Sequence, residues 1–419
     1  MPRVASVTAD ERGTLWKTNG FLQYDQATAH AIGPAATVST PPSSPLGSIH
    51  MTSQAIISAD SHFVEPPEMW RERVDAEYRD RAPRLVTEIN GKRGTYLVCE
   101  DLLPATGGGF FAAGTAPEDL PEVLERGYET VPEHVRNPRA RINAQRSDGV
   151  IAEVLYSSYG MQLFSLEDGN LRDACFRAFN DWAADYCSES RDRLIGIGLV
   201  ALDDVPRAVT EIKRIAAKGL KGAMIWAEPP EDLPYSHPTY EPFWAAAQEL
   251  DMKMSLHSLT SKRQNSDPAR GDMLFRSILL YQEVARTMTD LIIHGVLEKF
   301  PTLKFISAEN EIAWIPFHLW RMDQLHEKLY KMSPVNLPMK PSNYFNRQFY
   351  ATFIEDPMFA STTSTMGVDN IMWSSDFPHL ASTYPHSRKF IDENLAGLSA
   401  ADQRKIVHDN VAKLYGISV

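Results

Sequence analysis

The sequence predicts an α/β fold, a distorted (β/α)8 TIM barrel with an insertion after the first strand. From residue 150 onward, short apolar runs alternate with longer stretches of helical spacing, which is the pattern of repeated βα units. Eight strand candidates occur in all, and eight parallel strands can close into a barrel. A doubly wound open sheet is the alternative, but no GxGxxG turn follows any of these strands.

The first predicted strand is the apolar run at residues 56–62, which ends in the sequence ADSH. The other seven are short apolar runs of the kind that parallel sheets bury. They lie at residues 151–160, 194–202, 219–230, 252–260, 303–310, 348–356 and 370–379.

Helices are predicted in the segments that separate these strands. Helical spacing covers residues 171–190, 205–218, 241–250 and 272–300, and a further helix starts around Pro316, which suits a first-turn position. The main break in the rhythm is residues 63–137, which contain GTYLVCEDL and ATGGGFFAAGT. We expect this segment to be an insertion with a small hairpin and loops over the barrel mouth.

The first 50 residues differ in composition from the rest of the chain. They contain TVSTPPSSPLGS and show no sustained amphipathic period, which predicts a flexible leader. The sequence GSIHM resembles a cloning seam, so Met51 is the expected natural start. The barrel domain is therefore expected to span residues 51–419.

The charge balance excludes two classes of partner. The 419 residues include 42 Lys and Arg against 54 Asp and Glu, a formal charge of -12 without any dense basic run. Nucleic acid and anionic membranes are poor partners for such a chain. No apolar segment has the length of a membrane span, and Cys99, Cys175 and Cys187 form no CxxC pair. We expect a soluble protein of the reducing cytoplasm.

Polar side chains with metal-binding chemistry occur at the ends of several predicted strands. Asp60 and His62 share one face of the first strand because alternate residues of a strand point the same way. His257 ends the fifth strand, Glu309 the sixth and Asp376 the eighth. Active sites of TIM barrels lie at these carboxyl ends, so the five side chains are expected to converge on one mouth.

This set of side chains predicts a bound divalent metal. Carboxylates within a few ångströms of one another raise each other's pKa unless a cation compensates them. Imidazole and carboxylate ligands suit zinc, iron or manganese; zinc is expected first, as one or two ions. Each residue also has a structural alternative: His257 could be a hydrogen-bonded core residue, Asp60 and Asp376 could cap turns, and Glu309 could pair with Arg321.

The strand-end residues, together with GVLEKFPTLKF (295–305) and SSDFPH (374–379), resemble the amidohydrolase superfamily, in the branch that includes aminocarboxymuconate semialdehyde decarboxylase. The resemblance covers roughly residues 55–417. It implies a distorted barrel with a divalent metal at its mouth, held by Asp60, His62, His257 and Asp376. It also implies that Asp376 accepts a proton from metal-bound water.

Two positions depart from the pattern of that branch. Its first-strand motif is commonly HxH or ExH, whereas here it is Asp60, Ser61, His62. Its sixth-strand position is usually His in the decarboxylases, whereas here it is Glu309. The additional negative charge could strengthen metal binding, accept a proton or admit a second ion.

Three functions remain open from the sequence. The first is a metal-dependent hydrolase that acts on an amide, ester, thioester or C–C bond, with Asp376, Glu309 and His257 as catalytic residues. The second is a non-oxidative decarboxylase of an aromatic or unsaturated acid. Hydrolysis is favoured because Glu309 replaces a neutral or positive donor. The third is a catalytically inactive metal-binding barrel.

Residues near the mouth are expected to contact a small-molecule substrate or to support the metal ligands. His379 lies just beyond Asp376, and Tyr156 and Trp226 follow the second and fourth strands. Phe110, Phe111 and Tyr159 add aromatic surface that suits a flat substrate, although aromatic residues are equally common in cores. The helix at 314–330 is expected to meet another subunit, so the resemblance also implies a homo-oligomer.

Overall fold

Eight parallel strands form a barrel in the computed structural model, which describes residues 55–100, 102, 104–262, 273–332 and 335–418. Hydrogen-bonded neighbours follow in the order β1-β5-β6-β7-β8-β9-β10-β11. The strands are β1 (Ile56–His62), β5 (Val150–Tyr156), β6 (Leu194–Leu199), β7 (Gly222–Ile225), β8 (Lys253–His257), β9 (Lys304–Ala308), β10 (Phe349–Phe353) and β11 (Ile371–Trp373). The predicted fold class and all eight predicted strand positions are confirmed.

The barrel closes between its first and last strands. Just beyond β11, the backbone N–H of Asp376 donates to the carbonyl of Asp60 at 3.0 Å. The backbone N–H of His62 donates to the carbonyl of Phe377 at 2.7 Å. Backbone hydrogen bonds therefore join the end of β1 to the residues after β11, and both segments carry side chains with metal-binding chemistry.

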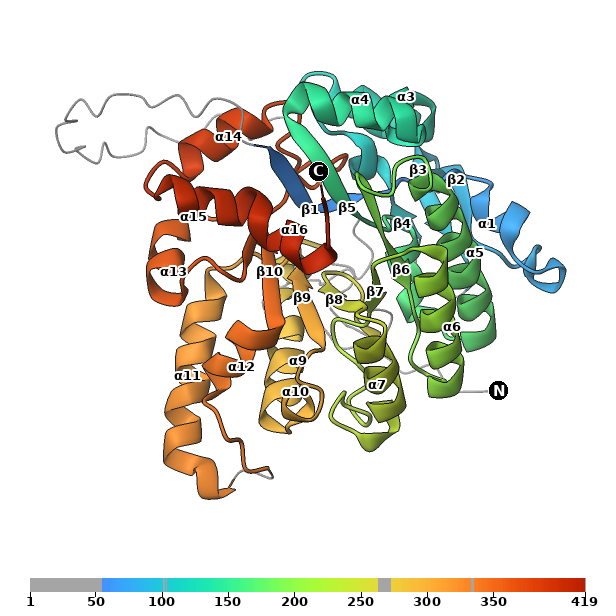
Figure 1. Cartoon of the computed structure of the whole chain (residues 1–419). Helices are drawn as coiled ribbons and strands as arrows, with labels where there is room; N and C mark the ends of the chain where they lie inside the picture. The colour runs from blue at the N-terminus through green and yellow to red at the C-terminus, as the bar shows by residue number, and fades with distance from the viewer. Residues whose placement is uncertain (1–54, 101, 103, 263–272, 333–334, 419) are drawn as a thin grey trace, which may run out of the picture. The chain divides into compact units, whose positions relative to one another are not determined.

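The strands are buried on both sides, as parallel strands between a barrel core and outer helices must be. All seven residues of β1 are buried, including Asp60 and His62. The strands surround a hydrophobic interior, and helices cover their outer side (Figure 1). The protein alone therefore shields the polar side chains at the strand ends from water.

Helices follow the strands as the apolar spacing predicts. In α6 (Val205–Lys218), the Asp204 side chain caps the first turn through the N–H of Arg207, and Gly219 ends the helix with φ +92°. The other barrel helices are α5 (Gly169–Cys187), α7 (Glu241–Glu249), α8 (Met273–Leu279), α9 (Tyr281–Ile293), α10 (Val296–Lys299), α11 (Trp314–Leu329), α12 (Pro341–Gln348), α13 (Phe359–Met366), α14 (Ser387–Asn394), α15 (Ala400–Arg404) and α16 (Asn410–Tyr415). None of the described helices is long and apolar enough to cross a membrane.

The insertion between β1 and β5 has a small antiparallel sheet of its own. It consists of β2 (Arg84–Ile89), β3 (Lys92–Val98) and β4 (Ala105–Thr106). The segment also contains α1 (Met69–Arg73), α2 (Leu120–Arg126), α3 (Glu133–Arg136) and α4 (Pro138–Asp148). Its glycine-rich part returns to the barrel mouth, where Ala113 donates to Pro378 at 3.0 Å and Leu380 donates to Gly109 at 2.8 Å through backbone N–H groups. The expected leader at residues 1–50 lies outside the described residues.

Candidate metal centre

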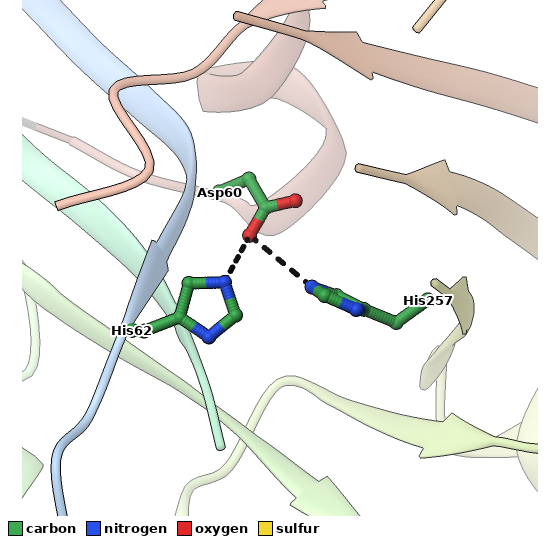
Figure 2. A group of neighbouring side chains, drawn as sticks. All are labelled: Asp60, His62 and His257. Atoms are coloured by element: carbon green, nitrogen blue, oxygen red, sulfur yellow. Dashed lines mark ion pairs between the residues drawn. The ribbon is translucent and has the colours of Figure 1, made fainter. Parts of the chain in front are cut away.

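Two histidines and an aspartate converge where β1 and β8 end (Figure 2). Asp60 Oδ1 lies 3.4 Å from His62 Nε2 and 3.7 Å from His257 Nε2. Asp60 and His62 point to one place because they occupy the same face of β1, as the sequence predicts. His257 reaches that place from four strands away because it is the last residue of β8.

Asp376 completes the group from the far end of the chain. Its Oδ1 lies 3.3 Å from His62 Nε2. The residue has a φ of +54°, a left-handed conformation that non-glycine residues seldom adopt. This turn lets the carboxylate point back to the barrel axis directly after β11.

Backbone carbonyls fix the orientation of the two imidazoles. His62 Nδ1 lies 3.1 Å from the Ser157 carbonyl, and His257 Nδ1 lies 3.0 Å from the Ser258 carbonyl. Because a carbonyl oxygen only accepts, each Nδ1 carries a hydrogen, and each ring in its neutral form presents a lone pair at Nε2. The rings stand at 88° with centroids 5.1 Å apart, so both lone pairs can reach one point.

Four inward-facing atoms have no hydrogen-bond partner within the described residues. These are Asp60 Oδ1, His62 Nε2, His257 Nε2 and Asp376 Oδ1. All four side chains are at most 2% exposed, and an unpaired buried polar atom is costly. A single divalent cation would pair all four atoms, so these residues fit a metal.

The pKa shifts of these residues reflect the absence of compensating charge. Burial raises the pKa of Asp376 well above its usual value, and the nearby carboxylates of Glu309 and Asp60 raise it further. Burial lowers the pKa of His62. Burial also acts to lower the pKa of His257, but Asp60, Glu309 and the Ser258 carbonyl outweigh it and raise the pKa to about 9.

His379 lies beside the four ligand-type residues without converging on the same point. Its ring stacks on that of His62 at 3.8 Å between centroids and 27° between planes. Imidazole lone pairs lie in the ring plane, so two stacked rings cannot both aim at one ion a bond length away. His379 Nδ1 instead faces Asp376 Oδ1 at 3.1 Å, while its Nε2 lies 2.8 Å from Ser158 Oγ. We therefore place His379 next to the metal set rather than in it.

Glu309 lies at the outer edge of this site. Its Oε2 is 3.5 Å from His257 Nε2 and accepts a hydrogen bond from Ser258 Oγ at 2.9 Å. The side chain is 28% exposed, and the two clusters with metal-binding spacing, Asp60–His62–His257 and His62–Asp376–His379, do not include it. Arg321, the alternative partner, donates to Gln324 instead.

The aromatic residues predicted near the mouth have different surroundings. Tyr156 packs against His257 at 5.0 Å between centroids and hydrogen-bonds Ser255 Oγ, so it supports the histidine from below the strand ends. Trp226 is buried, with its indole N–H on the Phe164 carbonyl. Phe110 from the insertion packs on His379 at 4.9 Å and on Tyr159 at 5.1 Å. Phe111 packs instead towards Tyr128.

Three supporting residues are not among those predicted from the sequence. Thr352, on β10, donates to Asp60 Oδ2 at 3.3 Å. The buried guanidinium of Arg141 donates to the carbonyls of His62 and Phe377 and pairs with Glu153. Ser158 contacts His379. The strand-end rule applies to Ser158 and Thr352 as it does to His257, but a hydroxyl in a strand is too common a feature to stand out.

Comparison with known proteins places this chain in a family. The amidohydrolase family profile matches residues 142–417. Two gamma-resorcylate decarboxylases are relatives: that of Rhizobium sp. (strain MTP-10005) is 26% identical over 252 residues, which cover 57% of this chain and 75% of the relative. That of Polaromonas sp. (strain JS666) is 23% identical over 321 residues, which cover 73% and 94%.

Solved structures share the fold. An amidohydrolase from Mycobacterium avium subsp. paratuberculosis K-10 superposes with a TM-score of 0.71 and 23% identity, covering 87% of this chain and 98% of the other. A dihydroxybenzoic acid decarboxylase from Polaromonas sp. JS666, with bound manganese and 2-nitroresorcinol, has a TM-score of 0.62 and 20% identity, covering 86% and 97%. Because the family profile spans more than half of the sequence, the chain belongs to the amidohydrolase family.

Proposed function

We propose that this protein is a metal-dependent, non-oxidative decarboxylase of an aromatic acid with a hydroxyl group beside its carboxylate. The observation that carries the proposal is the set of four unpaired buried atoms on Asp60, His62, His257 and Asp376. The relatives named gamma-resorcylate decarboxylase support this reaction over hydrolysis. The sequence-based preference for hydrolysis is not confirmed.

The cation would be held by Asp60, His62, His257 and Asp376. When bound, it would supply positive charge for an anionic carboxylate and its neighbouring oxygen. Two carboxylates and two neutral imidazoles suit several divalent metals. The manganese in the Polaromonas structure supports testing manganese first, in place of the expected zinc.

Asp376 is the proton donor in the proposed reaction. It delivers a proton to the ring carbon that bears the carboxylate. The bond between that carbon and the carboxylate then breaks, its electron pair returns to the ring, and carbon dioxide leaves. The step consumes one proton for each product molecule. His379 contacts Asp376 Oδ1 and the insertion residue Phe110 covers His379, so both shield the proton from bulk water.

Hydrolysis is the second candidate, and one observation favours it. Glu309 is a carboxylate at the edge of the site, 28% exposed and held by Ser258, where it can accept a proton from water. In hydrolysis, Asp376 and Glu309 would both act as general bases.

Labelled solvent separates the two reactions. Metal-free protein would be reloaded with Mn²⁺ or Zn²⁺ and incubated with one panel of hydroxybenzoates, which includes 2,6-dihydroxybenzoate, and separately with a second panel of aryl amides, esters and thioesters. Decarboxylation predicts carbon dioxide release and deuterium at the vacated ring position in D₂O. Incorporation of ¹⁸O from water into a product carboxylate, without carbon dioxide, would establish a hydrolase. Metal binding without turnover on either panel would favour an inactive barrel.

The surface of α11 supports a homo-oligomer. Ile315, Leu319 and Met322 face the core, yet Phe317 and Trp320 on another side are 68% and 54% exposed, with ring centroids 5.9 Å apart. We propose that a second copy of the chain covers this face, because exposed aromatic pairs are typical of interfaces. Light scattering should give a dimer or larger assembly for the wild type and a smaller species for Trp320→Glu.

The cysteines support a reducing compartment. Cys99, Cys175 and Cys187 are buried, and none is in a disulfide. Burial raises the pKa of the Cys187 thiol to about 12, so the reactive thiolate is disfavoured. We therefore propose that the protein works in the cytoplasm.

A further inference from the structure

We propose that Glu65 is a positioning residue, whose buried carboxylate shapes the turn after β5 so that a carbonyl of this turn orients the metal ligand His62. The inference rests on the metal set of the proposed function, but not on which reaction the metal supports. Glu65 lies three residues beyond His62 and is fully buried. Its effect would pass through the turn at residues 157–160, from which the carboxylate accepts three hydrogen bonds.

The three donors contact both oxygens of the Glu65 carboxylate. The Ser157 hydroxyl and the Gly160 N–H, the latter at 3.2 Å, donate to Oε1, and the Tyr159 N–H donates to Oε2 at 3.0 Å. A 3₁₀ helix begins at Gly160, and the first N–H groups of a helix have no partner within it. The carboxylate therefore caps this helix from another part of the chain. Burial raises the pKa of Glu65, and the three donors act against that rise because they favour the charged form.

The segment that carries Glu65 also contacts the start of the same turn. The Phe63 N–H donates to the Tyr156 carbonyl at 2.7 Å, and Ser158 Oγ donates to the Phe63 carbonyl at 2.5 Å. These bonds hold the turn where it leaves β5. The three bonds to Glu65 hold its remaining peptide groups, so their loss would free the direction of the turn rather than its starting point.

The Ser157 carbonyl lies between these two sets of contacts. The hydroxyl of the same residue is bound to Glu65, and the N–H groups two and three residues later are bound to the same carboxylate. The carbonyl lies 3.1 Å from His62 Nδ1. A partner that fixes one ring nitrogen also fixes the direction of the other, and His62 Nε2 faces Asp60 and Asp376. Glu65 thus acts on His62 Nε2 through the Ser157 peptide group.

The turn also supports the insertion at the barrel mouth. Tyr159 is fully buried, and its ring centroid lies 5.1 Å from that of Phe110. A Cβ at Gly107 would collide with the Tyr159 ring, so the insertion lies directly on this residue. Phe110 in turn packs on His379 at 4.9 Å. A turn displaced by the loss of the Glu65 contacts would therefore disturb the metal ligand and the aromatic cover of the mouth together.

A purely structural role for Glu65 makes a different prediction. Loss of a buried hydrogen-bond acceptor lowers the free energy of unfolding wherever the acceptor lies. If that were its whole effect, the folded variant would keep the bond between His62 Nδ1 and the Ser157 carbonyl, and its metal affinity would not change. A positioning role predicts that both change in protein that is still folded.

Glu65→Gln tests the role with little change of shape. The amide has one oxygen and one NH₂ group, so at least one of the three donors must face an N–H instead of an oxygen. Glu68→Gln is the matched control, because Glu68 lies three residues away, is exposed and makes no side-chain capping bond. Ser157→Ala removes one donor but keeps the carbonyl that faces His62, so it should have a weaker effect of the same kind.

Two measurements report on His62 without any need for activity. The affinity for Mn²⁺ or Zn²⁺, from competition with a coloured chelator, should fall about 10- to 100-fold in Glu65→Gln, as it does when other residues that orient a metal ligand are changed. In metal-free protein labelled with ¹⁵N-histidine, the Nδ1–H signal of His62 is assigned by its loss in His62→Gln. This hydrogen should exchange slowly with solvent in the wild type and in Glu68→Gln, and faster in Glu65→Gln. Urea denaturation establishes that each variant is folded.

The outcomes separate this inference from the proposed function. Unchanged metal affinity and an unchanged His62 signal in folded Glu65→Gln would overturn the positioning role and leave decarboxylation in place. Should Glu65→Gln fail to fold, the same result in Ser157→Ala would overturn it. A wild type that binds no metal and releases no carbon dioxide, yet whose His62 signal depends on Glu65, would disprove the proposed function and leave the positioning role in place.

Discussion

The imidazole of His62 stands edge-on to that of His257, with planes at 88° and centroids 5.1 Å apart. Perpendicular rings whose Nδ1 atoms are both bound to carbonyls can direct their Nε2 lone pairs to a common point. Asp60 Oδ1 lies next to both of these nitrogens. The arrangement of His62 and His257 therefore leads to a direct prediction about metal content.

His257→Ala should greatly reduce metal binding. The variant removes one of the four inward-facing atoms, and we expect the affinity for Mn²⁺ or Zn²⁺ to fall at least about 100-fold, since even residues outside the ligand set cost 10- to 100-fold. Elemental analysis after dialysis measures the loss. His294→Ala is the control, because His294, the residue after α9, is 46% exposed and bonds Asp290. Full occupancy in His257→Ala would remove this residue from the metal site.

Metal binding should release a proton at neutral pH. His257 has its pKa raised to about 9 in the metal-free protein, so it is protonated at pH 7 and must lose that proton to bind a metal. Below pH 9 the affinity should rise about tenfold per pH unit through this group. Calorimetry in two buffers of different ionisation enthalpy counts the protons. An affinity that is flat between pH 6 and pH 9 would contradict the prediction.

The same pKa shift predicts how the stability of the metal-free protein changes with pH. A group whose pKa is higher in the folded state than its unfolded value, about 6.5 for His, stabilises the fold fully below that value. The contribution of His257 is lost as the pH rises through its folded pKa of about 9. Urea denaturation of metal-free protein at pH 6, 7.5 and 9 should therefore show a decrease that His257→Ala lacks.

The positions of the strands could be predicted because each strand is a short run rich in apolar residues, as in Leu194–Leu199, where all six residues are buried. The convergence of Asp60 and His62 also follows from the sequence, since alternation along a strand is a local property. The place of Glu309 is different. It lies just past β9 with a φ of +54°, and this turn directs its side chain to the rim. Backbone angles of that kind are set by tertiary contacts.

Residues that depend on contacts between distant segments could not be placed from the sequence. His379 is fixed by Phe110, which lies in the insertion, and by Ser158 beyond β5. Trp226 follows a barrel strand, as predicted, but its indole N–H is bound to the Phe164 carbonyl within the core. Whether such a side chain lies at the barrel mouth or in the core depends on packing between residues that are more than 60 positions apart in the sequence.

Arg141→Met should lower both the stability of the protein and its affinity for the metal. Arg141 and Glu153 form a buried ion pair at 2.6 Å, and Arg141 also donates to the carbonyls of His62 and Phe377. Removal of one partner of a buried pair costs about 3–5 kcal/mol of unfolding free energy. Urea denaturation measures this, with Arg139→Met as the control, because Arg139 lies on the same helix and is 79% exposed.

The double variant Arg141→Met, Glu153→Gln tests the cause of that loss. If the uncompensated Glu153 carboxylate is responsible, neutralising it should restore part of the stability. Gln145, which also donates to Glu153, can pair with the new amide oxygen. The metal affinity should stay low, because the contacts to the His62 and Phe377 carbonyls are still missing. No recovery of stability would mean that these carbonyl contacts account for the loss.

Asp376→Asn should abolish turnover and leave the fold largely intact. The amide has nearly the same shape but cannot act as a carboxylic acid that donates a proton, and proton transfer by a positioned group contributes about 10²- to 10⁴-fold. The loss of one anionic ligand should also weaken metal binding, so rates are compared at saturating Mn²⁺. Release of carbon dioxide from 2,6-dihydroxybenzoate, or from the best substrate of the panel, measures the effect. Asp369→Asn, at an exposed aspartate paired with Lys405, is the matched control and should retain the wild-type rate. A near-normal rate in Asp376→Asn would exclude Asp376 as the proton donor.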